Sequence, residues 1–158
     1  MAPSFAFLSQ FKSAKSYNYP GGSDDNAAGF VFYNGWAEWC ESYLAGSAFA
    51  DYLRDPNVLG FFSDNEINFS SNSSRILDRF LAINSSNDPA YVAAKAFMDS
   101  KGTQSVTDAL NNEFAGIVAE KYYKAVKEAV MKVDDKLLYL GTRLHGTPKY
   151  MELSLIHI

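Results

Sequence analysis

Apolar residues recur at helical spacing through residues 106–133, the longest periodic stretch of the chain. Positions three and four apart share one face of a helix, and here they form a continuous apolar stripe. Glu120 and Glu128 each precede a lysine by four positions, the favourable order for an ion pair on a helix surface. Ser105 and Asp108 match the spacing of a capping box. We therefore predict one long helix, whose stripe consists of Val106, Leu110, Phe114, Ile117, Val118, Tyr122, Val126, Val130 and Val133.

Three shorter helices are predicted at residues 36–53, 73–82 and 89–100. The first has apolar side chains near helical spacing and ends before an Asp-Pro pair, because a proline disfavours helical geometry in the residue before it. The third has the clearest start. Asp88 is a favoured capping residue, and Pro89 fits the first helical position.

Two short strands are predicted, at residues 57–63 and 137–141, and each contains a continuous apolar run. Such runs are typical of parallel strands that are covered on both faces. Residues 5–12 alternate weakly and predict another strand, and the Gly-, Ser- and Asp-rich residues 13–29 predict a long loop. Strands that alternate with helices in this way predict an α/β fold with parallel strands.

The composition argues against two classes of partner, nucleic acids and membranes. The chain has 158 residues, 47% of them hydrophobic, and a formal net charge of −4. It has no basic patch that would favour nucleic acid. It also has no apolar run near the roughly 20 residues that a membrane span requires. We expect one globular domain that binds neither nucleic acid nor membrane.

Both apolar runs are followed by polar side chains that could perform chemistry. Asp64, Asn65 and Glu66 follow the first run, and Arg143 and His145 follow the second. The carboxyl ends of parallel strands lie at one edge of a sheet, and in α/β barrels this edge carries the active site. We therefore treat these residues as candidates for one site.

The acid cluster has three interpretations. Asp64 or Asn65 could cap a turn, with Glu66 simply solvated. A divalent-metal site is also conceivable, although no partner ligand accompanies the cluster at a convincing spacing. Alternatively, Glu66 is a catalytic acid/base, since burial between a strand and a packed loop would favour its proton-donating form. Asn65 would then offer a hydrogen bond to a sugar hydroxyl.

Asp64 is a poor candidate for the second carboxylate of a glycosidase. In retaining enzymes the two carboxyl groups lie about 5–5.5 Å apart on opposite sides of the scissile bond. Residues two apart on one strand project side by side from the same face. We therefore assign Asp64 a supporting role next to Glu66.

The stretch "DPNVLGFFSDNEI" resembles the fourth-strand motif of clan-A glycoside hydrolases, in which an Asn-Glu pair ends the strand. With the later "YLGTRLHG", the chain most resembles the β-agarases of glycoside hydrolase family 50 and their relatives. The resemblance implies part of a (β/α)8 TIM barrel, roughly its third to fifth βα units. It also implies a retaining hydrolase of a galactan-type polysaccharide. We expect no cofactor and no metal.

By the same resemblance, Glu66 would be the acid/base and Asn65 a substrate-binding residue. Arg143 and His145 would line subsites at the exit of the fifth strand. The family's nucleophile is a glutamate at the end of the seventh strand, which this chain lacks, so we expect the chain alone to be inactive. Another clan-A glycosidase, for example a β-galactosidase-like enzyme, and a non-catalytic carbohydrate-binding α/β domain remain alternatives. A polymeric substrate would imply a secreted or periplasmic protein.

Three further candidates each have a structural alternative. Trp36 follows Asn34-Gly35 and could stack on a sugar ring, but its helical spacing with Trp39 also suits core packing. Arg143 could bind an anionic sugar substituent or pair with Asp64. His145 could donate to substrate or be structural.

The last six residues, "LSLIHI", equal an in-frame translation of the transposase adapter used in short-read library preparation. We therefore expect residues 153–158 to be non-biological and residues 1–152 to be a fragment of a single catalytic TIM-barrel domain. His157 is accordingly left out of the candidate site.

Overall fold

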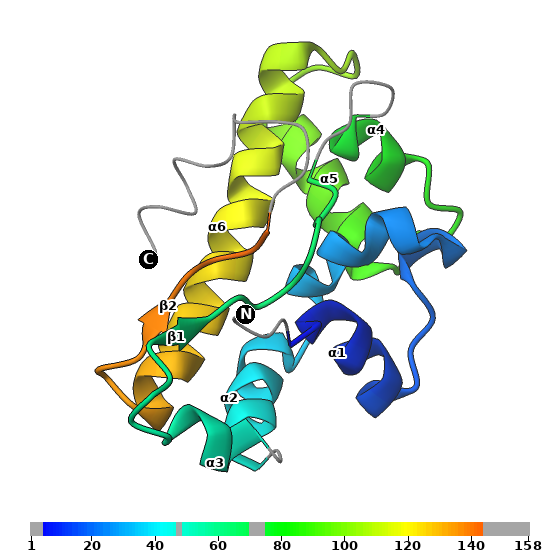
Figure 1. Ribbon diagram of the computed structural model, residues 1–158. Coiled ribbons are helices and arrows are strands. Elements are labelled where there is room, and N and C mark those ends of the chain that lie inside the picture. The colour runs from blue at the N-terminus through cyan, green and yellow to red at the C-terminus, as the bar shows by residue number, and fades with distance from the viewer. Residues whose placement is uncertain (1–4, 47–48, 70–74, 144–158) are drawn as a thin grey trace.

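A computed structural model of the chain describes residues 5–46, 49–69 and 75–143 (Figure 1). Most of the regular elements are helices, and the described residues contain one pair of strands. In chain order the elements are α1 (Phe7–Lys15), the 3₁₀ segments η1 (Pro20–Gly22) and η2 (Asp24–Phe32), α2 (Trp36–Gly46), α3 (Phe49–Leu53), β1 (Gly60–Phe61), α4 (Ile76–Leu81), α5 (Pro89–Ser100), α6 (Asp108–Val133) and β2 (Leu138–Tyr139).

Helix α6 is the long helix that the apolar stripe predicts, and it runs through most of the height of the molecule (Figure 1). Its cap is Thr107, whose hydroxyl accepts a hydrogen bond from the backbone N–H of Leu110 at 3.3 Å. The helix therefore begins two residues after the start that the Ser105 pattern indicates. The central part of the stripe is buried and its other members are half-buried, and α2, α4 and η2 pack against α6. No helix of the described residues is long and apolar enough to cross a bilayer.

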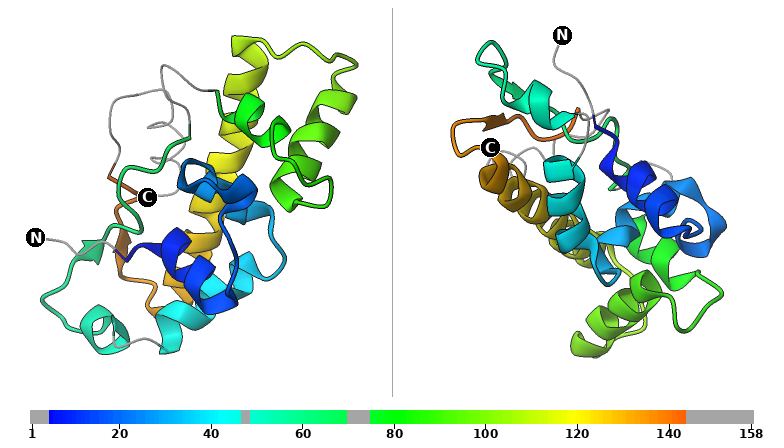
Figure 2. Two further views of the ribbon diagram at one scale, coloured as in Figure 1. Left: turned by 90° about the vertical axis from the view of Figure 1, so that its right-hand side faces the viewer. Right: turned by 90° about the horizontal axis from the view of Figure 1, so that it is seen from below.

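The shorter helices also follow their sequence signals. α5 spans Pro89–Ser100 as predicted, and the Asp88 carboxylate accepts hydrogen bonds from the next two backbone N–H groups of the helix, at 2.9 and 3.4 Å. α4 occupies the central part of the predicted residues 73–82. The predicted helix over residues 36–53 is present as α2 and α3, between which residues 47–48 lie outside the described part. α4 and α5 gather at one end of α6, away from the strands (Figure 2).

The N-terminal prediction is wrong, because residues 7–12 of the predicted strand form the first part of helix α1. Phe7, Leu8 and Phe11 share one helical face and are buried with 0%, 5% and 0% exposure, so the weak alternation came from a helical stripe. The predicted loop that follows includes η1 and most of η2. Phe30 of η2 lies fully in the core, packed on Phe11 at a ring-centroid distance of 5.4 Å.

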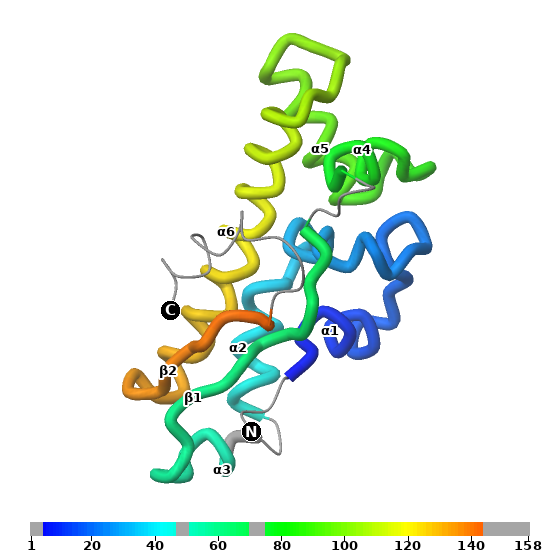
Figure 3. Tube along the Cα trace, turned by 45° about the horizontal axis from the view of Figure 1, so that its top comes forward, coloured from blue at the N-terminus to red at the C-terminus, as the bar shows by residue number. Residues whose placement is uncertain are grey.

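The two strands are parallel, as predicted, with Gly60 opposite Leu138 and Phe61 opposite Tyr139. They lie side by side across α6 in Figures 1 and 3. Gly60 allows this approach, because a Cβ there would lie 2.1 Å from the Leu138 carbonyl oxygen. The runs are not buried throughout, since Leu59 is 78% and Leu138 52% exposed. The described strands form an α/β arrangement, and a closed barrel is not present in them.

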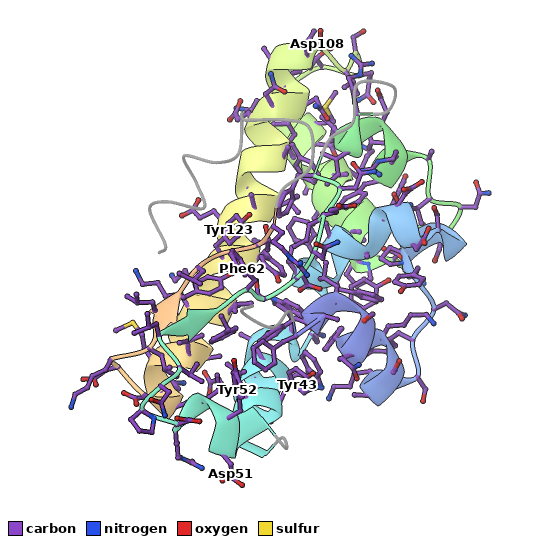
Figure 4. All side chains as sticks on the ribbon, in the orientation of Figure 1. Tyr43, Asp51, Tyr52, Phe62, Asp108 and Tyr123 are labelled. Atoms are coloured by element: carbon purple, nitrogen blue, oxygen red, sulfur yellow. The ribbon has the colours of Figure 1, made fainter. Side chains whose placement is uncertain are left out.

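Beyond the regular strands, backbone hydrogen bonds continue toward the polar ends. Ser63 N–H donates to Gly141 O at 2.9 Å, and Arg143 N–H donates to Asp64 O at 3.1 Å. On the other edge, Phe5 N–H donates to Ser63 O at 3.2 Å. Tyr123 of α6, labelled in Figure 4, lies beside these segments, and its ring centroid is 6.4 Å from that of Tyr139. The ends of both runs are therefore held in one place.

Candidate active site

The stretch that follows β1 alternates between the core and the surface. Ser63 and Asp64 are buried, at 0% and 6% exposure, whereas Asn65 and Glu66 are exposed. Asn65 forms a parallel bridge with Arg143, and Glu66 N–H donates to the Arg143 carbonyl at 2.7 Å. The backbone thus brings together three residues that the sequence proposes for one site, and it holds the Asn-Glu pair beside the exit of the second strand.

Glu66 has a left-handed backbone conformation, with φ at 54°. This conformation is unfavourable for residues other than glycine, and such outliers cluster at functional sites. The backbone bond to Arg143 helps to hold it there. Burial of Glu66, which the acid/base interpretation expects, is not found, because its side chain is exposed in this chain.

Asn65 and Glu66 line a cavity of about 340 Å³, together with Asp64 and the two residues after Glu66. The opposite wall comes from the start of α1 and from the η1–η2 region. Its lining residues are Ala6, Leu8, Ser9, Tyr19, Asp24, Asp25, Ala27 and Ala28. A cavity of this size can hold a sugar unit, and carboxylates, amides and a tyrosine are suitable partners for sugar hydroxyl groups.

No sequence pattern singles out Asp24, Asp25 and Tyr19, because they lie in the predicted loop of residues 13–29. Both aspartates are exposed at the cavity. The unusual length of that loop was the available signal, since long loops are often functional. Nothing local in the sequence shows that this loop folds back against the end of β1.

The Asp64 side chain points away from solvent and joins three elements. Its carboxylate accepts a hydrogen bond from the Tyr122 hydroxyl of α6 and from the backbone N–H groups of Phe7 and Leu8 at the start of α1. Burial raises the pKa of Asp64 to about 7, and these hydrogen bonds counteract part of that rise. Burial, followed by the nearby Asp64, raises the pKa of Tyr122 well above its ordinary value. The supporting role of Asp64 stays a prediction, and these contacts are the geometry through which it would act.

Polar side chains beneath the strand ends are hydrogen-bonded to one another. Ser63 Oγ and the Tyr139 hydroxyl lie 2.8 Å apart, and the Tyr123 hydroxyl and Thr142 Oγ1 lie 2.9 Å apart. All four residues are buried. Satisfied buried polar groups favour a single arrangement of the surrounding backbone. These pairs therefore stabilise the backbone around the strand ends, which carries Asn65 and Glu66.

Arg143 and His145, the candidates after the second strand, have different outcomes. Arg143 contacts Asp64 through the backbone, and no ion pair joins their side chains in the part of the chain that is described. Of its two predicted alternatives, pairing with the Asp64 carboxylate is therefore absent here. His145 lies outside the described residues. Its predicted role stays a prediction.

Trp36 is part of the core, with 3% exposure. Its ring packs against Phe11 and Tyr122 at centroid distances of 5.2 and 5.9 Å. It borders a second cavity of about 350 Å³, lined also by Lys121 and Glu128, and not the cavity of Glu66. A sugar has no free indole face to stack on here, because helical packing uses Trp36 as a core residue. The geometry therefore disfavours the predicted ligand role.

The sequence analysis also raises a divalent-metal site at the acid cluster. Among the residues that the structure describes, no group of three or more histidine, cysteine, aspartate or glutamate side chains could hold a metal ion.

No family model matches the chain, and no curated protein matches it. A solved structure, "Crystal structure of BpGH50", matches with 54% sequence identity and a TM-score of 0.91. The match covers 99% of this chain and 35% of that chain. The chain is therefore similar, along nearly its whole length, to about a third of a family 50 glycoside hydrolase. This agrees with the resemblance that the strand motifs carry.

Proposed function

We propose that this chain is part of a retaining glycoside hydrolase that cleaves a galactan-type polysaccharide, as β-agarases do, and that Glu66 is its acid/base. The observation that carries the proposal is the place of Glu66: it follows a parallel strand, beside Asn65, at a cavity of about 340 Å³. The similarity to BpGH50 supports a glycosidase over other classes that place acids at strand ends.

The proposed reaction has two steps. Glu66 first protonates the glycosidic oxygen of the leaving sugar, while a carboxylate on the other side of the ring forms a covalent bond to the anomeric carbon. Glu66 then removes a proton from the water that cleaves this intermediate. Asn65 donates a hydrogen bond to a sugar hydroxyl, and Arg143 and His145 line the exit of the neighbouring strand.

By the family resemblance, we place the nucleophile on a glutamate after the seventh strand, outside the residues described here. Asp64 is the carboxylate nearest in sequence, but it is buried against Tyr122 and α1 and cannot face the sugar from the opposite side. Because the chain covers 35% of BpGH50, we propose that residues 1–152 are one part of a single (β/α)8 domain whose other parts supply the nucleophile. Secretion or export to the periplasm belongs to the same proposal, since a polysaccharide substrate is extracellular.

The test is Glu66→Gln in the protein extended by the remaining units of the domain. Hydrolysis of agarose should fall by about two to four orders of magnitude, while oligosaccharide affinity changes little, because glutamine keeps the size but cannot transfer the proton. Glu120→Gln on α6, which removes another exposed carboxylate, serves as the matched control and should leave turnover unchanged. Unchanged hydrolysis by the Glu66 variant would contradict the assignment.

The alternatives give different outcomes in the same assay. A β-galactosidase-like enzyme would prefer short galactosides to agarose and would still depend on Glu66. A non-catalytic carbohydrate-binding domain would bind oligosaccharides, and its extended wild type would hydrolyse none of them.

A further inference from the structure

Arg79 connects the two walls of the cavity from outside it. Its Nη1 donates to the backbone carbonyl of Asp25 at 2.7 Å, and its Nη2 donates to the carbonyl of Asn68 at 3.0 Å. Asp25 belongs to η2, and Asn68 belongs to the segment that carries Glu66. Asn68 Nδ2 also donates to Asp25 Oδ1 at 3.4 Å, so the two walls touch at this point.

The guanidinium group of Arg79 is suited to holding two hydrogen-bond acceptors at a fixed distance from each other. It is planar, and its donors form a rigid fork, so two acceptors bound to it are held at a set separation. Arg79 belongs to α4, which packs on η2 and α6 and is therefore anchored in the core. Asp25 and Asn68 both line the cavity, whereas Arg79 does not. Arg79 thus lies behind the cavity and joins its two sides.

Stability alone does not explain this arrangement. Arg79 is half-buried, and burial lowers the pKa of its guanidinium. Its Nε is buried and has no hydrogen-bond partner among the described residues. The lost solvation of a half-buried guanidinium offsets part of what its two hydrogen bonds contribute to stability. We therefore expect the net contribution of Arg79 to stability to be small.

We propose that Arg79 is a positioning residue that sets the width of the sugar-binding cavity, by holding the segment of Glu66 against the wall of Asp24 and Asp25. This inference rests on the proposed function of the cavity. Arg79 itself touches no substrate. It binds the two carbonyl groups and thereby determines where the polar side chains of the cavity lie.

The test compares Arg79→Met, Arg79→Lys and the wild type in the extended protein, with agaro-oligosaccharides as substrate. Arg79→Met should raise KM by about tenfold and change kcat by less than about threefold, because the wall of η2 would contact sugar away from the reacting bond. Its melting temperature should stay close to that of the wild type or rise. Arg79→Lys keeps the charge without the fork and should restore less than half of the loss in KM.

Arg75→Met is the matched control. Arg75 lies one turn before Arg79 and binds Asp78, Asp108 and the Val106 carbonyl, none of which lines the cavity. It should leave KM unchanged. An Arg79→Met variant with unchanged KM, or one whose loss lysine restores in full, would overturn the inference. An inactive extended wild type would instead overturn the proposed function.

Discussion

Two aspartates, Asp88 and Asp64, bind the first backbone N–H groups of a helix and also accept a hydrogen bond from a tyrosine. Asp88 does this for its own helix, α5, and accepts from the Tyr33 hydroxyl at 2.8 Å. Asp64 does it for α1, which lies far earlier in the chain, and accepts from Tyr122. The contacts have the same chemistry, but one cap is local and the other is tertiary.

The difference lies in burial and in what each cap connects. Asp88 sits at the partly exposed start of α5 and organises only that start and Tyr33. Asp64 is 6% exposed, and burial raises its pKa to about 7. The hydrogen bonds of Asp64 attach the chain after β1 to α1 and α6, two residues before Glu66. A remote cap thus costs desolvation but fixes the place of the candidate acid/base relative to the opposite wall.

The largest expected effect is a loss of stability when the remote cap is removed. Asp64→Ala removes the buried acceptor shared by the Tyr122 hydroxyl and two backbone donors, so the free energy of unfolding should fall by about 3–5 kcal/mol. Asp88→Ala should cost about 1 kcal/mol, since water can reach the exposed donors. Urea unfolding of the two variants measures both values. Equal losses would contradict the distinction between the two caps.

The next effect is a dependence of stability on pH that belongs to Asp64. Its pKa is about 7 in the folded protein and near 3.8 in the unfolded chain. Between these values the folded state keeps a proton that the unfolded state has released, so the stabilisation is complete below about pH 4 and is lost as the pH rises toward 7. The difference in unfolding free energy between wild type and Asp64→Asn should fall by about 1.4 kcal/mol per pH unit in this window. A flat difference would show that Asp64 stays ionised.

The smallest effect concerns the two tyrosines. Tyr122→Phe removes a donor from a buried carboxylate and should cost about 1–2 kcal/mol, while raising the pKa of Asp64 further. Tyr33→Phe removes the equivalent bond from the partly exposed Asp88 and should cost about 0.5 kcal/mol. Thermal unfolding at pH 8 and pH 5 separates them, because only the Tyr122 variant should change the pH dependence attributed to Asp64.

The same comparison explains how much of the fold could be predicted. α5 and α6 were predictable because Asp88-Pro89 and the apolar stripe are local signals. α1 was not, because its own N-terminal residue, Ala6, has a left-handed φ of 51° and no side-chain cap. Its cap comes from Asp64, and no local pattern in residues 5–12 records that contact.

The candidate site divides in the same way. Asn65 and Glu66 were predictable, because acids that follow an apolar strand are a local pattern. Asp24 and Asp25 were not, because only the packing of η2 brings them to the cavity. Arg79 was not, because only the packing of α4 places it behind the cavity, where it binds the Asp25 carbonyl. Trp36 was misjudged because its helical spacing, a local signal for the core, was given less weight than its position after a turn.

The central claim is that Glu66 transfers the proton to the leaving group. The most direct test compares a substrate whose leaving group must be protonated with a substrate whose leaving group need not be. In the extended protein, Glu66→Gln should lose about two to four orders of magnitude on agarose. On a dinitrophenyl glycoside, whose leaving group departs without a proton, formation of the glycosyl intermediate should slow by less than about tenfold. Azide, a nucleophile that needs no base, should then restore turnover. Equal losses on both substrates, with no effect of azide, would contradict the assignment of Glu66 as the acid/base.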